Sequence, residues 1–282
     1  MLTEQQLKIR KNSIGGSDSA IILGLSNYKT PYELYLEKTG DVEPSLEYTD
    51  AQYWGSTLEP IVRDEFAKRH ECKIETPDII YHPMYSFMHA NVDGVIKTEG
   101  ADEVLEIKCA NSFAGKVWGE PGSDFIPPSY LIQVAHYCSV LNLDVARIAV
   151  LIGGYDYREY TYNRDMSLEN RIIEACSDFW KCVQRKTPPT LTTPNDARLM
   201  YKDHQEEKSI VAGYESLGAV EALRQLKSSN KEAKAKEDEL KLIIMKSMED
   251  AEMLLDAEER CIATWKTNKR GARTLLLKNI ED

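Results

Sequence analysis

The feature that most constrains this chain is a change in the spacing of its apolar residues. Around residues 55–69 apolar side chains recur with the 3.6-residue period of a helix, whereas from residue 73 to residue 109 short apolar runs between Gly and Pro turns indicate strands. We expect helices at 31–40, 55–69, 129–141 and 167–185, and strands at 73–81, 87–96, 103–109, 147–152 and 157–162. This order predicts an α/β fold in which helices flank a mixed central β-sheet.

The sequence changes character after Lys186. The Pro/Thr-rich stretch 186–194 is typical of a linker, and it predicts one domain over residues 1–190 and an extension over 191–282. Residues 214–258 are highly charged and predict long amphipathic helices, which could form a helical hairpin. Residues 260–282 form a basic tail with strand-like ends.

Composition excludes several classes of protein. With 42% hydrophobic residues the chain can bury a core, and no apolar run is long enough to cross a bilayer. The first residues lack the apolar stretch of a signal peptide, so we expect a cytoplasmic protein. The six cysteines include no CxxC pair, which favours free thiols over disulfides and argues against zinc or iron–sulfur sites.

The charge balance is acidic, with a net charge of -11 at pH 7. Such a surface does not attract nucleic acid along its whole extent. A groove lined with Arg and Lys is still compatible with this total, and a cluster of metal-binding carboxylates would add to the acidic count. The local pattern of charge is therefore more informative than the sum.

The local pattern that carries chemistry is Asp93 followed by Glu106-Ile107-Lys108. Glu106 and Lys108 are two positions apart on an expected strand, so both side chains point to one face. Asp93 ends the preceding strand and can lie beside them. Two carboxylates, with the Ile107 carbonyl as a third oxygen, suit Mg²⁺, and a bound Mg²⁺ can activate water for attack on a phosphodiester. The ordinary alternative is a solvated edge strand that alternates Glu and Lys.

Two further groups of residues gain meaning beside this pattern. Glu59 lies on an upstream helix, and Gln133 and Tyr137 share one face of a downstream helix, where such residues are commonly only half-buried packing. Near the N-terminus, Arg10 and Ser17 flank Gly15-Gly16 ahead of an apolar helix. An Arg fork and a hydroxyl at a helix start can bind an anion, although Arg10 could equally be a surface charge.

Taken in order, these pieces resemble the PD-(D/E)xK nuclease superfamily, and within it the phage lambda exonuclease and YqaJ-like viral recombinase family. The matching segments are RKNSIGGS, GSTLEP, ANVDGVI, LEIKC and QVAHY, which together span about residues 8–185. The chain departs from the family pattern at Val92, where a proline is usual, and at Ala110, where Pro and a basic residue often follow.

The resemblance implies a role for each matching residue. It implies a metal site of Glu59, Asp93, Glu106 and the Ile107 carbonyl, with Lys108 orienting water and Gln133 supporting the catalytic group. It implies a site for a DNA 5′-phosphate at Arg10, Ser17 and Asn91, the last in place of a serine, with Tyr137 and Lys116 as further supporting residues.

The activity implied is that of a metal-dependent DNA exonuclease, a phosphodiester hydrolase that uses Mg²⁺ or Mn²⁺. Such an enzyme digests the 5′-ended strand of linear double-stranded DNA and leaves 3′ overhangs for phage-type recombination. The resemblance also implies a trimeric ring around DNA, a single-strand annealing protein as partner, and a location in the bacterial host cytoplasm. A structure-specific endonuclease of the same superfamily and a non-catalytic DNA-binding scaffold are the alternatives.

Overall fold

A computed structural model describes residues 4–43, 49–267 and 271–278 of the chain. The chain divides into two compact units, unit 1 over Met1–Asp203 and unit 2 over His204–Asp282. All six cysteines are free thiols, as the sequence predicts. Within the described ranges, no helix is long and apolar enough to cross a membrane.

Unit 1 is built on a mixed five-stranded sheet of order β1-β4-β5-β6-β7, in which only β5 and β6 run parallel. The strands of unit 1 are β1 Lys73–Glu75, β2 Ile80–Tyr81, β3 His89–Ala90, β4 Gly94–Lys97, β5 Glu103–Ala110, β6 Val145–Ile152 and β7 Asp156–Asn163. β2 and β3 form a separate antiparallel pair. The predicted mixed sheet flanked by helices is confirmed.

Two strands expected as single runs are each split in two. The run expected at 73–81 becomes β1 and β2, separated by a stretch that contains Pro77, which lacks the N–H that a strand ladder needs. The run expected at 87–96 becomes β3 and β4, because the chain leaves the ladder at Asn91–Asp93. This second break forms part of the site described below.

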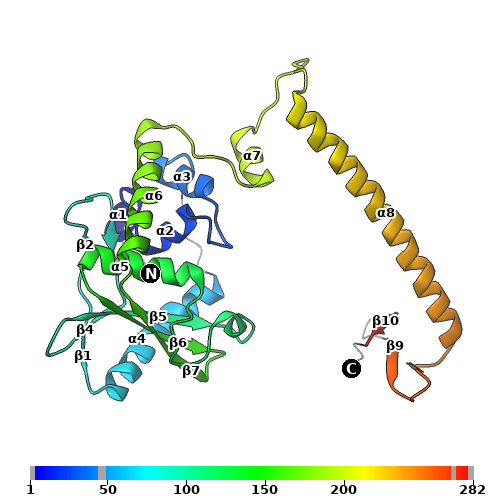
Figure 1. Cartoon of the computed structure of the whole chain (residues 1–282), viewed down its shortest axis with the longest axis horizontal. Helices are drawn as coiled ribbons and strands as arrows, with labels where there is room; N and C mark the ends of the chain where they lie inside the picture. Colours follow the sequence, from blue (N-terminus) through cyan, green and yellow to red (C-terminus); the bar gives the residue numbers. More distant parts are fainter. Residues whose placement is uncertain (1–3, 44–48, 268–270, 279–282) are drawn as a thin grey trace. The chain divides into compact units, whose positions relative to one another are not determined.

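Helices cover both faces of the sheet (Figure 1). The helical elements of unit 1 are α1 Glu4–Lys11, α2 Gly16–Ile22, α3 Pro31–Thr39, α4 Asp50–Arg69, the 3₁₀ turn η1 Ala114–Val117, α5 Pro128–Leu141, α6 Met166–Arg185 and α7 Pro194–Met200. α4 packs Val62 and Phe66 against Leu105 and Ile107 on one face. α5, α2 and α6 pack together over the other face.

The α4 helix begins earlier than its apolar pattern indicates. Its first turns include residues before 55, where the expected helix starts, and they are exposed apart from Gly55. The start is set instead by Thr49, whose side chain accepts a hydrogen bond from the Gln52 backbone N–H in a capping box. A cap acts through hydrogen bonds at the helix end, so the spacing of apolar residues does not predict where a capped helix starts.

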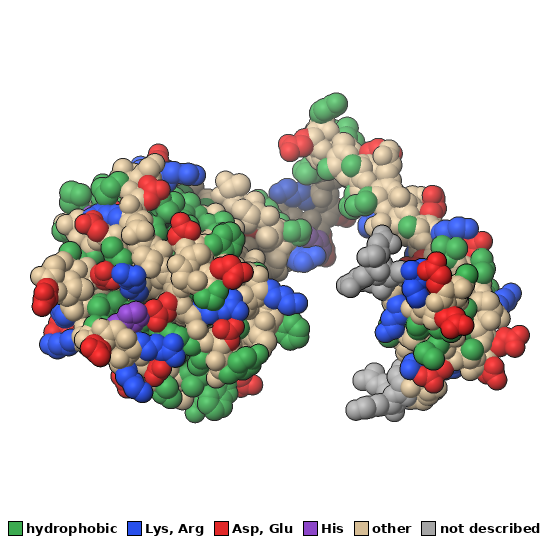
Figure 2. Space-filling model, turned by 60° about the horizontal axis from the view of Figure 1, so that its bottom comes forward, with side chains coloured by type: hydrophobic (Ala, Val, Ile, Leu, Met, Phe, Trp, Pro, Cys, Tyr) green, Lys and Arg blue, Asp and Glu red, His purple; other side chains and the backbone are tan. Residues whose placement is uncertain are grey.

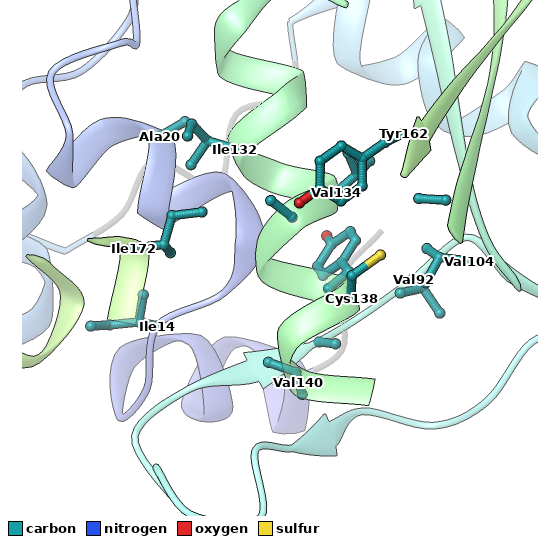
Figure 3. Close-up of a cluster of buried hydrophobic side chains, with 14 of the residues drawn as sticks. Ile14, Ala20, Val92, Val104, Ile132, Val134, Cys138, Val140, Tyr162 and Ile172 are labelled. Atoms are coloured by element: carbon teal, nitrogen blue, oxygen red, sulfur yellow. The ribbon is translucent and has the colours of Figure 1, made fainter. Parts of the chain in front are cut away.

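The core of unit 1 is organised around α5, in which the nine residues from Ile132 to Val140 are all buried. In Figure 3, Val134 and Cys138 lie toward Val104 of the sheet, while Ile132 lies toward Ala20 of α2. A helix placed between a sheet and other helices is buried on every side. That placement is what takes the polar residues of α5 into the interior.

Unit 2 holds one long helix and a small sheet. α8 runs unbroken over Tyr214–Met248, and the strands β8 Met253–Leu255, β9 Cys261–Thr267 and β10 Arg273–Leu277 pair antiparallel in the order β10-β9-β8. The helical hairpin considered from the sequence is therefore wrong, and the helix also ends before the expected residue 258. Pairs such as Lys241–Glu237 at i,i+4 favour one continuous helix.

Residues 191–203, which the sequence assigns to the extension, lie in unit 1. Asp196 of α7 is fully buried and accepts a hydrogen bond from Thr30 Oγ1 at 2.7 Å. Leu191 and Leu199 pack against the core cluster. The Pro/Thr-rich stretch is thus a docked segment of the first unit.

Candidate active site

Glu106 and Lys108 lie on β5 and face α5, as their two-residue spacing predicts. Their side chains form an ion pair in which Glu106 is only 2% exposed and Lys108 is 21% exposed. Gln133 Nε2 of α5 donates to Glu106 Oε1 at 2.7 Å and also lies 3.1 Å from the Tyr137 hydroxyl oxygen. Two donors therefore hold the Glu106 carboxylate: the ammonium of Lys108 on the sheet and the amide of Gln133 on α5.

Asp93 joins this cluster by replacing part of the strand ladder. β4 pairs with β5 up to Gly94 opposite Leu105, and a continued register would place Asp93 opposite Glu106 and Val92 opposite Ile107. There the Ile107 N–H donates instead to Asp93 Oδ2 at 2.7 Å. The N–H and C=O of a strand residue point to the same side, so the carbonyl of Ile107 faces the side occupied by Asp93.

The three charged groups alter one another's titration. Burial, with the charge of Asp93 added, raises the pKa of Glu106 to about 8. Burial also raises the pKa of Asp93, although Lys108 opposes this. Burial works against the charge of Lys108, but Glu106 and Asp93 outweigh it and raise the lysine pKa. Burial thus disfavours the charged form of both carboxylates, and a further positive charge beside them would stabilise it.

Glu59 approaches from α4, on the opposite face of the sheet. Its Oε1 accepts a hydrogen bond from Arg63 Nη2 at 2.6 Å, one helical turn along α4. Burial and the charge of Asp93 both raise the pKa of Glu59. Arg63 Nε is buried and has no hydrogen-bond partner among the described residues. Glu59 is thus paired with Arg63 and is electrostatically close to Asp93.

The oxygen donors of this pocket fit a divalent cation. Glu106 Oε2 is buried, and no described residue gives it a hydrogen-bond partner. Leaving a carboxylate oxygen buried and unpartnered is costly, and a bound cation removes that cost. In the part of the chain that the structure describes, no group of three or more His, Cys, Asp and Glu side chains is placed to hold a metal. The oxygen donors that lie together here are Asp93, Glu106 and the Ile107 carbonyl, while the Glu59 carboxylate is paired with Arg63 near Asp93.

The residues expected to bind a 5′-phosphate lie around the start of α2. Ser17 is exposed in its first turn, directly after Gly16, where an added Cβ would lie 2.6 Å from Tyr137 Cε1. Glycine at this position therefore lets α2 approach Tyr137 closely. Burial raises the pKa of Tyr137 well above its usual value, and the exposed Arg10 opposes that shift, which places the charge of Arg10 on the same side of the site.

Two other predicted residues lie on exposed segments. Asn91 is exposed in the break between β3 and β4, two positions before Asp93. Lys116 is exposed in η1 and lines a surface pocket with Trp118 and Arg158. The structure thus brings together Asp93, Glu106, Lys108, Gln133 and Tyr137, and no contact joins the Lys116 side chain to them among the described residues.

Several residues of the site carry no motif that the sequence reveals. The Tyr130 ring lies under Lys108, with its centroid 5.0 Å from Nζ, and it stacks on Trp118. For Arg63 the sequence does offer a signal: it lies four residues after Glu59, a spacing that allows the two side chains to pair on one helix face. Asp18 and Lys38 form a buried ion pair behind the Arg10–Ser17 segment.

Comparison with solved structures identifies the fold. An alkaline exonuclease, LHK-Exo, from Laribacter hongkongensis superposes with a TM-score of 0.54 and 20% identity, over 66% of this chain and 94% of that one. The structure of the same protein in complex with dAMP matches with the same values. The fold is therefore the one shared by this exonuclease.

Comparison of sequences identifies the family. The model of the YqaJ-like viral recombinase domain matches residues 5–144, a range that contains Asp93, Glu106, Lys108 and Gln133. The uncharacterized protein YqaJ of Bacillus subtilis (strain 168) is 36% identical over 260 residues, which cover 89% of this chain and 80% of that protein. Together with the fold, this identity over nearly the whole length shows that the chain belongs to the YqaJ-like viral recombinase family.

Proposed function

We propose that this protein is a metal-dependent DNA exonuclease that degrades one strand of linear double-stranded DNA from its 5′ end. The observation that carries the proposal is the cluster of Asp93, Glu106 and Lys108, in which one oxygen of the buried Glu106 carboxylate has no hydrogen-bond partner among the described residues. The fold of a protein named an alkaline exonuclease supports it, as does the complex of that protein with dAMP, a nucleoside monophosphate.

In this proposal Asp93, Glu106 and the Ile107 carbonyl hold Mg²⁺, for which Mn²⁺ can substitute. A divalent cation there acidifies a bound water and neutralises charge on the phosphodiester. Lys108, held on Glu106 Oε1, is placed to orient the attacking water and to donate to a phosphate oxygen. Gln133 keeps the Glu106 carboxylate in one orientation through its Nε2 donor.

The reaction is hydrolysis at the phosphate that follows the terminal nucleotide. The water oxygen forms a bond to phosphorus, the bond from phosphorus to the 3′ oxygen breaks, and that oxygen leaves as the 3′-hydroxyl of a released mononucleotide. The shortened strand then carries a new 5′-phosphate. A pocket for a 5′-phosphate therefore meets the same chemical group in every cycle.

We place that pocket at Arg10 and Ser17, with Asn91 as a third contact. Both Arg10 and Ser17 are exposed, and both lie on the Tyr137 side of the cluster. An arginine binds a phosphate through two parallel hydrogen bonds and keeps its charge at any working pH. The neighbouring hydroxyl supplies a further donor.

The family relationship also supports a trimeric ring around DNA, a single-strand annealing protein as partner, and action in the host cytoplasm. On the face of unit 1 drawn in Figure 2, Lys and Arg side chains are interspersed with Asp and Glu among the described residues. DNA binding in this proposal relies on a local basic lining rather than on the whole surface. Sedimentation of the protein with and without duplex DNA tests the trimer.

The experiment that tests the function is digestion of linear duplex DNA with Mg²⁺, with a closed circular plasmid as control. We expect mononucleotides from the linear duplex and an intact plasmid. Linearisation of the plasmid would identify an endonuclease, and DNA binding without any product would identify a scaffold. An Asp93→Asn variant checks that the products come from this site.

A further inference from the structure

A buried ion pair lies behind the segment that carries Arg10 and Ser17. Lys38 Nζ of α3 is 2.7 Å from Asp18 Oδ2 of α2, and the two side chains are only 4% and 6% exposed. Lysine is among the residues least often buried, because its ammonium loses hydration. A buried lysine that makes full use of its donors therefore calls for a specific role.

All three N–H donors of Lys38 have partners in this part of the chain. Besides Asp18, its Nζ donates to the Ser13 carbonyl at 2.7 Å and to the Arg10 carbonyl. Asp18 Oδ2 in turn accepts the Gly15 N–H at 3.1 Å. One ammonium group thus joins the end of α1 to the start of α2. Two of its contacts are with the carbonyls of Arg10 and Ser13, and the third is with Asp18.

The carboxylate of this pair keeps its charge. Burial alone would raise the pKa of Asp18, but Lys38 and then Arg10 outweigh burial and hold that pKa below its usual value. The contacts of Lys38 and Asp18 join three points of one short segment. They fix the backbone of residues 10–18, and so they fix the separation of the two side chains at the ends of that segment, Arg10 and Ser17.

We propose that Lys38 is a positioning residue that sets the distance between Arg10 and Ser17 and thereby determines the preference for 5′-phosphorylated DNA ends. The inference rests on the proposed function, in which Arg10 and Ser17 bind the phosphate. Lys38 itself does not contact DNA. A small displacement of Arg10 or Ser17 weakens the phosphate site strongly, because its contacts must be met at once.

The experiment compares kcat and KM on two linear duplexes that differ only in a 5′-phosphate or a 5′-hydroxyl end. The variants are Lys38→Met, Lys38→Arg and the double variant Asp18→Asn/Lys38→Met. The double variant removes the pair without leaving a buried charge alone, so it remains informative if Lys38→Met fails to fold. Lys29→Met is the matched control, since Lys29 also pairs with a carboxylate of α3, Glu37, at 2.6 Å but is 32% exposed.

We expect loss of Lys38 to lower the ratio of kcat/KM for phosphorylated over hydroxyl ends by about ten-fold, mainly through KM. Rates on hydroxyl ends should stay close to wild type, Lys38→Arg should recover most of the ratio, and Lys29→Met should leave it unchanged. A purely structural role predicts equal losses on both substrates, together with a lower melting temperature, and that outcome overturns the proposal.

An Arg10→Ala variant measured in parallel separates the two hypotheses. If Arg10→Ala lowers the ratio and both Lys38→Met and the double variant leave it intact, the role of Lys38 is wrong and the phosphate site stands. If the wild type shows no preference for phosphorylated ends, or Arg10→Ala leaves the preference unchanged, the phosphate site is wrong and the role of Lys38 falls with it.

Discussion

Unit 1 and the long helix of unit 2 differ in where their charged side chains lie and in what those side chains contact. In unit 1, Glu106, Asp18 and Lys38 are buried and each has named partners in other elements. In α8 of unit 2, Met248 is the one buried residue, and charged pairs such as Lys236–Glu239 lie on the surface one turn apart. Unit 1 orients charges through tertiary contacts, whereas α8 uses them to stabilise a helix locally.

The difference indicates where chemistry can be located. Exposed pairs on a helix contribute only a few tenths of a kcal/mol and are screened by salt. Buried charges are costly, so they persist where the fold holds them in one geometry, and a held geometry is what catalysis needs. We therefore expect substitutions in unit 1 to alter cleavage and comparable substitutions in α8 to leave it unchanged.

The largest effect is expected at the cluster on β5. Lys108→Ala and Asp93→Asn should each lower the cleavage rate on the order of 10³-fold, since each disturbs stabilisation worth several kcal/mol at one reacting phosphate. The double variant should be little worse than either single variant, because the groups act as a unit. Lys236→Ala in α8 is the control, and near-wild-type cleavage by Lys108→Ala would contradict the assignment.

Replacement of Mg²⁺ by Ca²⁺ should separate DNA binding from hydrolysis. Both ions accept oxygen ligands, but Ca²⁺ has looser geometry and activates its water less. We expect duplex binding to persist in Ca²⁺ while product formation falls to background. Gel-shift and product assays on the same samples measure both, and equal cleavage with the two ions would rule out this metal chemistry.

A smaller effect is expected at the DNA end. Arg10→Ala removes a charge-assisted phosphate contact worth about 1.5–3 kcal/mol, so digestion of 5′-phosphorylated ends should slow ten- to hundred-fold. Digestion of 5′-hydroxyl ends should change little. Both substrates are compared at one salt concentration, because phosphate contacts weaken as salt rises. A parallel loss on both ends would show that Arg10 has a general role instead.

Stability should depend on pH through two buried histidines of unit 1. Burial lowers the pKa values of His89 and His136 from 6.5 to about 4. Above pH 6.5 both histidines are neutral in the folded and in the unfolded state, so they do not reduce the free energy of unfolding. As the pH falls from 6.5 toward 4 the unfolded chain binds protons that the folded state does not, so up to ~1.4 kcal/mol per pH unit is lost for each histidine.

The measurement is urea unfolding at several pH values for wild type and a His136→Gln variant. His136 Nε2 donates to the His89 carbonyl at 2.9 Å, and Nδ1 lies 2.6 Å from Ser19 Oγ, so a second ring proton on Nδ1 would require the Ser19 hydroxyl to turn from donor to acceptor. The difference between the two proteins isolates this residue from the buried carboxylates. Identical pH dependence in both would show that His136 titrates normally in the folded state.

The sequence predicted those parts of the site that follow from local periodicity. The two-residue spacing of Glu106 and Lys108 determines their shared face, and the four-residue spacing of Gln133 and Tyr137 does the same on α5. The Asp93 contact with Ile107 depends on where two strands separate, which strand propensity does not reveal. The contact lies at the break between β3, which pairs with β2, and β4, which pairs with β1 and β5.

The residues that sequence reasoning missed are defined by long-range partners. Lys38 contacts the carbonyls of Arg10 and Ser13, and a surface lysine on a short helix would have the same local sequence. Arg63 donates to the Glu59 carboxylate, a pair that the four-residue spacing permits but does not require. The contacts of Lys38 depend on which groups meet in three dimensions and on the cost of burying a charge, and spacing does not encode them.

The smallest effect on activity is expected from removing unit 2. A chain ending at Asp203 should fold and cleave linear DNA at the wild-type rate, because the clustered site residues and α7 all lie in unit 1. A chain ending at Thr190, near the boundary that composition suggests, should be less stable. It loses Asp196, which is fully buried and accepts from Thr30 Oγ1 and from the backbone N–H groups of Thr192 and Thr193.

The shorter chain leaves Thr30 without that acceptor and exposes the surface covered by Leu191 and Leu199. Each hydrogen bond contributes about 1 kcal/mol and each partly buried leucine a comparable amount, so a loss of roughly 2–4 kcal/mol is expected. Thermal melting of the two truncated chains measures the difference. Equal melting temperatures would place the boundary before α7, and loss of cleavage in the longer chain would show that unit 2 supplies something the reaction needs.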